Sequence, residues 1–227
     1  AEFGFSRSVL TSQNATLILA YYIYKGGSVD KESKKGMRLY LIHALLNTIF
    51  GSSQDQLITN LRNGFREEVA VLGKSEYFLK SKKFSFSDVL KIDLPQQKSL
   101  AVTEDDIERF LQSKKGATSF FLLSLLYPQL RFNEVLFHQD HIHPAAGFNW
   151  SNLEEVGLDG TTYWEWNAYK DCVPNLQLME GRQNESKNAT PLIAWVGQMK
   201  EPERKKFAKD NYFPNGVKLD FKDFMEF

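Results

Sequence analysis

The amino-acid sequence predicts an α+β protein in which helices are in the majority. Two observations lead to this fold class. Over residues 35–50 and 53–69 the apolar side chains recur at the three- and four-residue spacing of an amphipathic helix, and residues 14–24 and 117–127 are apolar along most of their length. After Pro128 this spacing gives way to two short strand-like runs, separated by a long, irregular and aromatic-rich stretch. We therefore expect a helical region, residues 1–128, followed by a smaller α+β domain, residues 129–227.

Five segments of the helical region are predicted to be helices. They are 14–24, 35–50, 53–69, 103–111 and 117–127. Glycines follow the first two segments and Pro128 follows the last, and such residues commonly end helices. Ser53 suits the N-cap of the third helix, and Thr103 with Asp106 resembles a capping box. The Lys- and Ser-rich segment 72–100 has no regular pattern.

The second domain is predicted to contain two strands and two helices. Residues 134–137 and 175–179 are the strand candidates, because they are short, largely apolar runs next to turn residues. A helix over 184–196 is expected to follow the second strand, in spite of Pro191. The last, charged helix is expected to begin at residues 201–202, where proline occupies the first turn.

The composition excludes several classes of protein. Basic and acidic residues number 28 each, so the formal net charge is zero and the basic surplus of a typical nucleic-acid binder is missing. Any DNA contact must then depend on local patches or on a part outside this chain. The single cysteine, Cys172, excludes a disulfide framework and a four-cysteine zinc site. We expect no membrane span and no signal peptide, and hence a cytoplasmic protein.

A cluster of ionisable residues follows the first strand candidate. Three of the four histidines lie within residues 138–143, next to Asp140. Histidine suits general-base catalysis, and carboxylate and amide oxygens suit Mg²⁺ or Mn²⁺. Hydrolysis of a phosphodiester requires a base that activates water, a cation that offsets the phosphate charge, and stabilisation of the leaving oxygen. A strand–strand–helix unit with Asp-His on one strand and Asn on the helix could supply all three.

Three short runs resemble the motif of HNH (ββα-metal) nucleases. Residues 140–144, Asp-His-Ile-His-Pro, resemble the opening of that motif. Residues 175–178, Asn-Leu-Gln-Leu, resemble its middle part, shortened by one residue, and 184–187, Asn-Glu-Ser-Lys, resemble its end. Asp-His alone is a weak signal, but the three runs in this order and spacing are a specific one.

The longer run 174–191 is similar to the C-terminal nuclease domain of GmrSD-type modification-dependent restriction enzymes, which include the phosphorothioate-sensing SspE proteins. The helices before Pro128, with the turn at residues 50–55, resemble the helical region between the two domains of these enzymes. The resemblance implies that a nucleotide-binding, modification-sensing domain precedes this chain. We therefore expect the chain to be a fragment of a larger protein.

The resemblance also implies roles for single residues. His141 is expected to be the general base, and Asp140 and Asn184 are expected to hold one divalent cation, Mg²⁺ or Mn²⁺. Asn175 is expected to hold the loop and the backbone of His141 in place without touching the metal.

Two further residues are expected to contact nucleic acid. Lys187 lies one helical turn after Asn184, which suits a phosphate contact. His143 departs from the usual motif and could be a metal ligand, a substrate contact or a bystander. A structural zinc site made of His138, His143 and Cys172 is a less favoured alternative.

The predicted function is therefore metal-dependent DNA cleavage, as a nick or a double-strand cut, in defence against phage. Little sequence preference is expected, because nothing in the motif reads base edges. The alternative is a non-catalytic module that binds DNA or regulates a sensor domain to which the helices dock.

Overall fold

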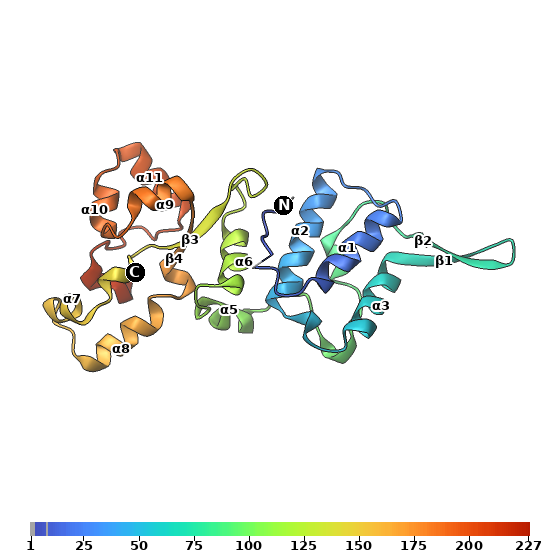
Figure 1. Cartoon of the computed structure of the whole chain (residues 1–227), viewed down its shortest axis with the longest axis horizontal. Helices are drawn as coiled ribbons and strands as arrows, with labels where there is room; N and C mark the ends of the chain where they lie inside the picture. Colours follow the sequence, from blue (N-terminus) through green and yellow to red (C-terminus); the bar gives the residue numbers. More distant parts are fainter. Residues whose placement is uncertain (1–2, 8) are drawn as a thin grey trace. The chain divides into compact units, whose positions relative to one another are not determined.

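The computed structural model describes residues 3–7 and 9–227. The described chain is mostly helical and contains two antiparallel sheets of two strands each, so the predicted α+β class is confirmed (Figure 1). The chain divides into two compact units. The helical unit comprises residues 6–107, and the C-terminal unit comprises residues 108–227 together with 3–5.

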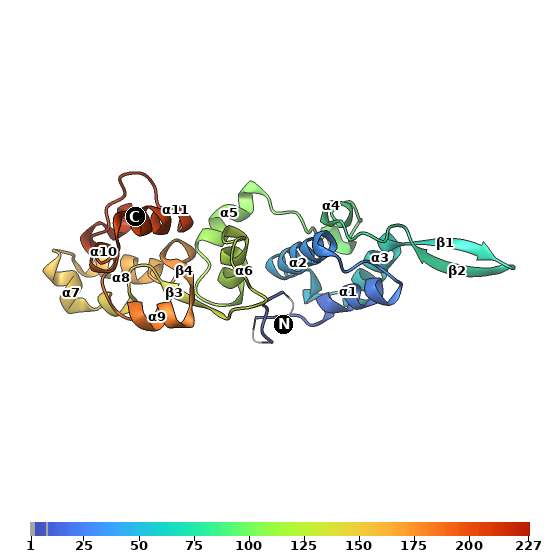
Figure 2. The ribbon, with the colours of Figure 1, turned by 90° about the horizontal axis from the view of Figure 1, so that it is seen from above.

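Three packed helices form the body of the helical unit, in which α1 contacts both α2 and α3 (Figure 2). Its helices are α1 (Asn14–Tyr24), α2 (Lys31–Leu46), α3 (Gln54–Phe65) and α4 (Phe86–Val89). α2 begins where Asp30 Oδ1 accepts a hydrogen bond of 2.8 Å from the backbone N–H of Ser33. Gly36 lets α2 pack closely against the backbone at Phe84, because a Cβ added at Gly36 would lie 2.6 Å from the carbonyl oxygen of Phe84.

Local capping signals in the sequence had mixed outcomes. Ser53 is the N-cap residue of α3, as predicted, but its backbone is left-handed (φ 49°) and its side chain makes no capping bond. The predicted cap near Thr103 is confirmed: its N–H and its hydroxyl each donate to Asp106 Oδ2 at 2.9 Å. Among the described residues, no helix is long and apolar enough to cross a membrane.

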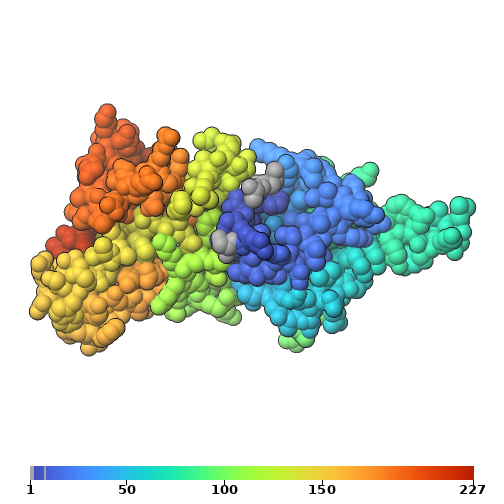
Figure 3. Space-filling model, in the orientation of Figure 1, coloured from blue at the N-terminus to red at the C-terminus, as the bar shows by residue number. Residues whose placement is uncertain are grey.

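A β-hairpin follows α3 and was not expected from the sequence. β1 (Arg66–Val71) pairs with β2 (Lys74–Leu79) through a two-residue turn, Leu72-Gly73, with φ of 50° and 75°. Figure 3 shows this ribbon extending away from the helices of its own unit. The predicted third helix therefore ends at Phe65 rather than at residue 69. The strands β1 and β2 are largely exposed on both faces. Their sequences therefore lack the alternation of apolar and polar residues that would distinguish a strand from a helix.

The boundary between the units lies earlier than the sequence suggested. α5 (Glu104–Leu111) crosses it, and α6 (Ala117–Leu126) lies wholly in the C-terminal unit, where it packs against the second sheet. Ser119 on α6 donates a 2.6 Å hydrogen bond to Gln139 Oε1 on that sheet. This contact assigns to the C-terminal unit a helix that sequence pattern grouped with the helices before Pro128.

The second sheet and one helix form the strand–strand–helix unit of the C-terminal unit. β3 (Phe137–His141) pairs with β4 (Leu176–Glu180), and α9 (Gly181–Lys187) packs against both strands. The other helices of this unit are α7 (Trp150–Glu155), α8 (Gly160–Tyr169), α10 (Leu192–Gly197) and α11 (Glu201–Asp210).

Two expected boundaries in this region differ from the structure. The first strand begins at Phe137 instead of residue 134, so Asp140 and His141 lie on the strand itself. The single helix expected over 184–196 is two helices, α9 and α10. The break occurs because Asn188 adopts a positive φ of 44° and Pro191 follows it.

Two small apolar clusters hold the segments that surround this sheet. One contains Phe148, Leu153, Trp166 and Phe224. The other contains Ile142, Leu192 and Val196. Ile142 and Phe148 belong to the loop that leaves β3, so both clusters fix the path of the chain immediately after the candidate site.

Candidate active site

Asp140 is held by a buried lysine. Lys187, at the end of α9, has no exposed side-chain surface, and its Nζ donates to Asp140 Oδ2 at 2.8 Å and to the backbone carbonyl of His141 at 2.5 Å. Gln177, which faces Asp140 across the sheet, donates its amide to the same Oδ2 at 3.2 Å. A buried ammonium requires such partners, because an unpaired charge in the interior is costly. The carboxylate therefore keeps a fixed orientation.

The expected phosphate contact of Lys187 does not agree with this geometry. Its ammonium lies in the interior and is directed at Asp140, so it is not available to a phosphate at the surface. A motif position alone could not reveal this, since lysine is usually exposed and its burial depends on how α9 packs on the sheet.

Asn175 fixes the loop after β3. Its side chain is buried, its Oδ1 accepts from the His143 backbone N–H at 2.8 Å, and its Nδ2 donates to the carbonyls of His143 (3.1 Å) and Lys170 (2.7 Å). Its own carbonyl accepts from Ile142 N–H at 2.8 Å. Asn175 thus holds the backbone at His143, two residues beyond the expected position. The His141 carbonyl is held by Lys187 instead.

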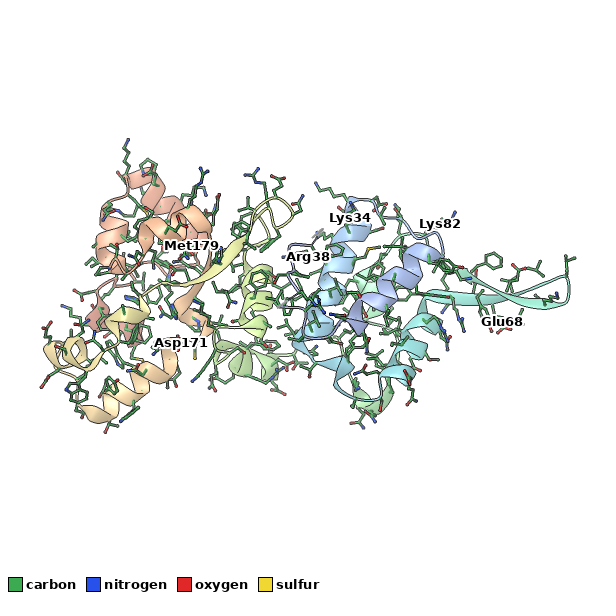
Figure 4. All side chains as sticks on the ribbon, viewed as in Figure 1. Lys34, Arg38, Glu68, Lys82, Asp171 and Met179 are labelled. Carbon is green, nitrogen blue, oxygen red and sulfur yellow. The ribbon has the colours of Figure 1, made fainter. Side chains whose placement is uncertain are left out.

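His141 is paired with a carboxylate that the sequence analysis did not identify. Its Nε2 lies 2.8 Å from Asp171 Oδ1, and its side chain is 12% exposed. Asp171 lies on the segment between α8 and β4 (Figure 4). An ionised carboxylate only accepts hydrogen bonds, so this pairing favours the neutral tautomer of His141 that carries its proton on Nε2 and its lone pair on Nδ1. In the sequence, the feature that could have pointed to Asp171 is its position four residues before Asn175, a residue of the motif.

Asp140 and Asn184 each keep a side-chain oxygen of the kind that a hard divalent cation prefers. Both hydrogen bonds to this carboxylate go to Oδ2, and within the described residues Oδ1 accepts none. Asn184 lies on α9, one turn before Lys187, and its side-chain amide likewise makes no hydrogen bond to the described chain. One carboxylate and one amide oxygen suit Mg²⁺, which commonly keeps several waters and binds through few protein ligands.

The charge balance indicates that such a cation would be weakly held. Lys187 already offsets the charge of Asp140. No group of three or more His, Cys, Asp or Glu in the described chain could hold a metal ion. The zinc alternative of His138, His143 and Cys172 therefore has no support in the structure, and the Cys172 thiol points to the carbonyls of Gln112 and Ala168.

Two comparisons with known proteins found no match for this chain. No family model matches it, and no curated protein matches it. The resemblance to HNH nucleases therefore stays an expectation based on three short runs. The geometry around Asp140, His141 and Asn175 is the observation that bears on function.

His143 lies in the interior rather than at a nucleic-acid surface. Its side chain is buried against Phe221, Phe224 and Phe227, with the last ring centroid 4.9 Å away. Burial, and then the positive charge of Lys187, lower the pKa of His143 to about 4. The ring is therefore neutral near pH 7. The expected nucleic-acid contact of His143 is not supported, because the ring is buried among phenylalanine rings and does not reach the surface.

Proposed function

We propose that this chain contains a ββα-metal (HNH-type) nuclease domain that hydrolyses phosphodiester bonds of DNA. One observation supports the proposal above the others. A histidine paired with a carboxylate, His141 with Asp171, lies next to Asp140 on a strand that is covered by the helix bearing Asn184. The general base and the hard oxygen donors thus come from one strand–strand–helix unit, and the segment before β4 supplies the orienting carboxylate.

In this mechanism His141 is the general base. Its Nε2–H is donated to Asp171, so Nδ1 can accept a proton from the attacking water. Asp171 then stabilises the imidazolium that forms, by the logic that applies to a histidine and aspartate in acyl-transfer enzymes. The exposed fraction of 12% leaves part of the His141 side chain accessible to water.

Asp140 and Asn184 would hold one divalent cation, Mg²⁺ or Mn²⁺. When bound, the cation supplies charge neutralisation at the phosphate and at the leaving oxygen. Lys187 and Gln177 orient the carboxylate from the other side. Asn175 keeps the loop after His141 in place.

The proposal includes the wider setting that the GmrSD-type resemblance implies. The domain would be the DNA-cutting part of a cytoplasmic phage-defence protein, and a sensor domain outside this chain would select the DNA. The net charge of zero supports this division, because a chain without a basic surplus binds DNA weakly and with strong salt dependence.

A non-catalytic role is the second candidate, and one observation favours it. Lys187 neutralises the Asp140 carboxylate without a metal, so the β3–β4 sheet and α9 can be stable as a purely structural unit. In that case the chain would bind DNA, or a sensor domain, without cutting DNA.

A plasmid-nicking assay separates the two candidates. The 227-residue chain is incubated with supercoiled plasmid and Mg²⁺ or Mn²⁺, with EDTA as the metal-free control. We expect slow metal-dependent nicking that His141→Ala lowers by about 10²–10⁴-fold. His138→Ala is the matched control on the same strand, since His138 is exposed and should leave the rate unchanged. Absence of nicking with either metal, or an equal loss in both variants, would reject catalysis by His141.

A further inference from the structure

A cavity of about 390 Å³ lies within the C-terminal unit, and the loop that follows His141 forms part of its wall. It is bounded by the loop that leaves β3, by α7 and by the segment between α9 and α10. Its lining residues include His143, Pro144, Asn152, Glu155, Leu192 and Phe221. The loop from β3 is the one that Asn175 clamps, so one rigid segment joins the cavity to His141.

The polar groups of the cavity are mainly acceptors. The amide nitrogen of Asn152 donates to the Gly147 carbonyl at 3.2 Å, which leaves its carbonyl oxygen for another partner. Glu155 is exposed and forms no ion pair with the described residues. The remaining wall is apolar and includes the ring of Phe221. A ligand that fits these groups has an apolar, flat body and several N–H donors.

His143 gives an independent indication of a missing partner. Its side chain is 1% exposed, and its Nε2 is buried without a hydrogen bond to any described group. An unsatisfied buried nitrogen destabilises the folded state, and such groups usually have a water or ligand partner. Since His143 lines the cavity, an occupant can supply that partner.

We propose that this cavity binds a nucleobase with an exocyclic amino group, from the DNA strand next to the cleaved phosphate. The inference rests on the proposed nuclease function. Cytosine, adenine and guanine can donate amino hydrogens to Glu155 and Asn152, and a carboxylate is a known acceptor for the cytosine amino group. Thymine has no amino group and would direct a carbonyl oxygen at Glu155. The chain would then prefer certain bases at the cleavage site, in contrast to the expectation from the motif.

Binding of free deoxynucleosides tests the pocket without any cleavage. Deoxycytidine, deoxyadenosine, deoxyguanosine and thymidine are titrated into the full 227-residue chain, and binding is followed by NMR shifts. We expect at least one amino-bearing nucleoside to bind, with thymidine at least about fivefold weaker, as the loss of one good base contact implies. Glu155→Ala should weaken binding by about the same factor.

Glu154→Ala is the matched control. Glu154 is the exposed neighbour of Glu155 on α7 and does not line the cavity, so this variant should bind as the parent does. Three outcomes would overturn the pocket: no nucleoside bound, thymidine bound equally well, or equal losses in the two variants. Nucleoside binding without nicking would retain the pocket and reject the nuclease. Nicking without nucleoside binding would retain the nuclease and reject the pocket.

Discussion

The described chain contains two antiparallel strand pairs, β1–β2 and β3–β4, which are both called hairpins below. Their strands have nearly the same length, but their surroundings are opposite. β1 and β2 are joined by a two-residue turn, and most of their residues are exposed. β3 and β4 are joined by the long segment 142–175, and β4 is buried except at Glu180. Only the second hairpin carries a network of buried polar side chains.

This contrast shows what a covered hairpin can do that an exposed one cannot. The first ribbon needs only its turn to set the register. The second is fixed by side chains from β4, from α9 and from the segments before and after β4, and these contacts orient Asp140 and His141. Substitutions in the covered hairpin should therefore have large effects, and substitutions in the exposed one small effects.

Removal of the buried ammonium should have the largest effect. Lys187→Met leaves the Asp140 carboxylate without its counter-charge, so the free energy of unfolding should fall by about 3–5 kcal/mol. Lys74→Met, in the exposed hairpin, should change it by less than about 0.5 kcal/mol. Urea unfolding measures both. A loss below about 1 kcal/mol for Lys187→Met would show that the pair is not structural.

The buried imidazole should make stability depend on pH. The folded-state pKa of His143, about 4, lies below the unfolded value of about 6.5, so its contribution is complete above pH 6.5 and is lost as the pH falls toward 4. The loss should be about 3 kcal/mol between pH 7 and pH 4. Lys187 lowers this pKa and Asp220 opposes it.

His143→Phe should remove this component, because the new ring cannot be protonated and still suits the aromatic surroundings. His138→Ala, on the exposed side of β3, should keep the full pH dependence. Chemical unfolding across the pH range provides the comparison. An unchanged slope in His143→Phe would contradict burial of a neutral ring.

The pairing of His141 with Asp171 can be tested with a nearly isosteric change. Asp171→Asn should lower the nicking rate by about 10–100-fold, as loss of a partner that orients a histidine commonly does. A structural defect alone would not change the histidine tautomer, so ¹⁵N NMR of the imidazole is the deciding measurement. The parent should show the Nε2–H form, and the variant a mixture. An unaltered tautomer would remove Asp171 from the mechanism.

A small effect of the opposite sign is expected at the tip of the exposed hairpin. Leu72 is 99% exposed and has a positive φ of 50°, which asparagine tolerates better than leucine. Leu72→Asn should therefore stabilise the protein by about 0.5–1 kcal/mol, whereas Leu72→Val should destabilise it. Thermal unfolding of the two variants and of the parent chain tests this. An unfolding midpoint for Leu72→Asn below that of the parent would contradict the left-handed turn.

The same contrast explains which features could be predicted from the sequence. Helices that are long apolar runs next to glycine or proline, such as α1 and α6, were expected within one residue of their observed ends. The covered hairpin was expected because its motif residues are unusual. The exposed hairpin was not, since its strands depend on pairing with each other rather than on one buried face.

Side-chain partners were the part that sequence pattern could not supply. The contacts of Asp171 with His141 and of Lys187 with Asp140 join residues 30 and 47 positions apart. Such contacts depend on the path of the whole intervening chain. The inward turn of His143 likewise depends on Phe224 and Phe227, near the other end of the unit.

The long segment between β3 and β4 has a consequence for the order of folding. The exposed ribbon closes a two-residue turn, and hairpins of this kind form in about 1–10 μs. Pairing of β3 with β4 must first bring distant parts of the chain together, and this loop-closure entropy is lost before any contact compensates for it. We therefore expect the Lys187–Asp140 pair to form late. In a refolding experiment, the residues of the candidate site should be the last to gain protection from hydrogen exchange.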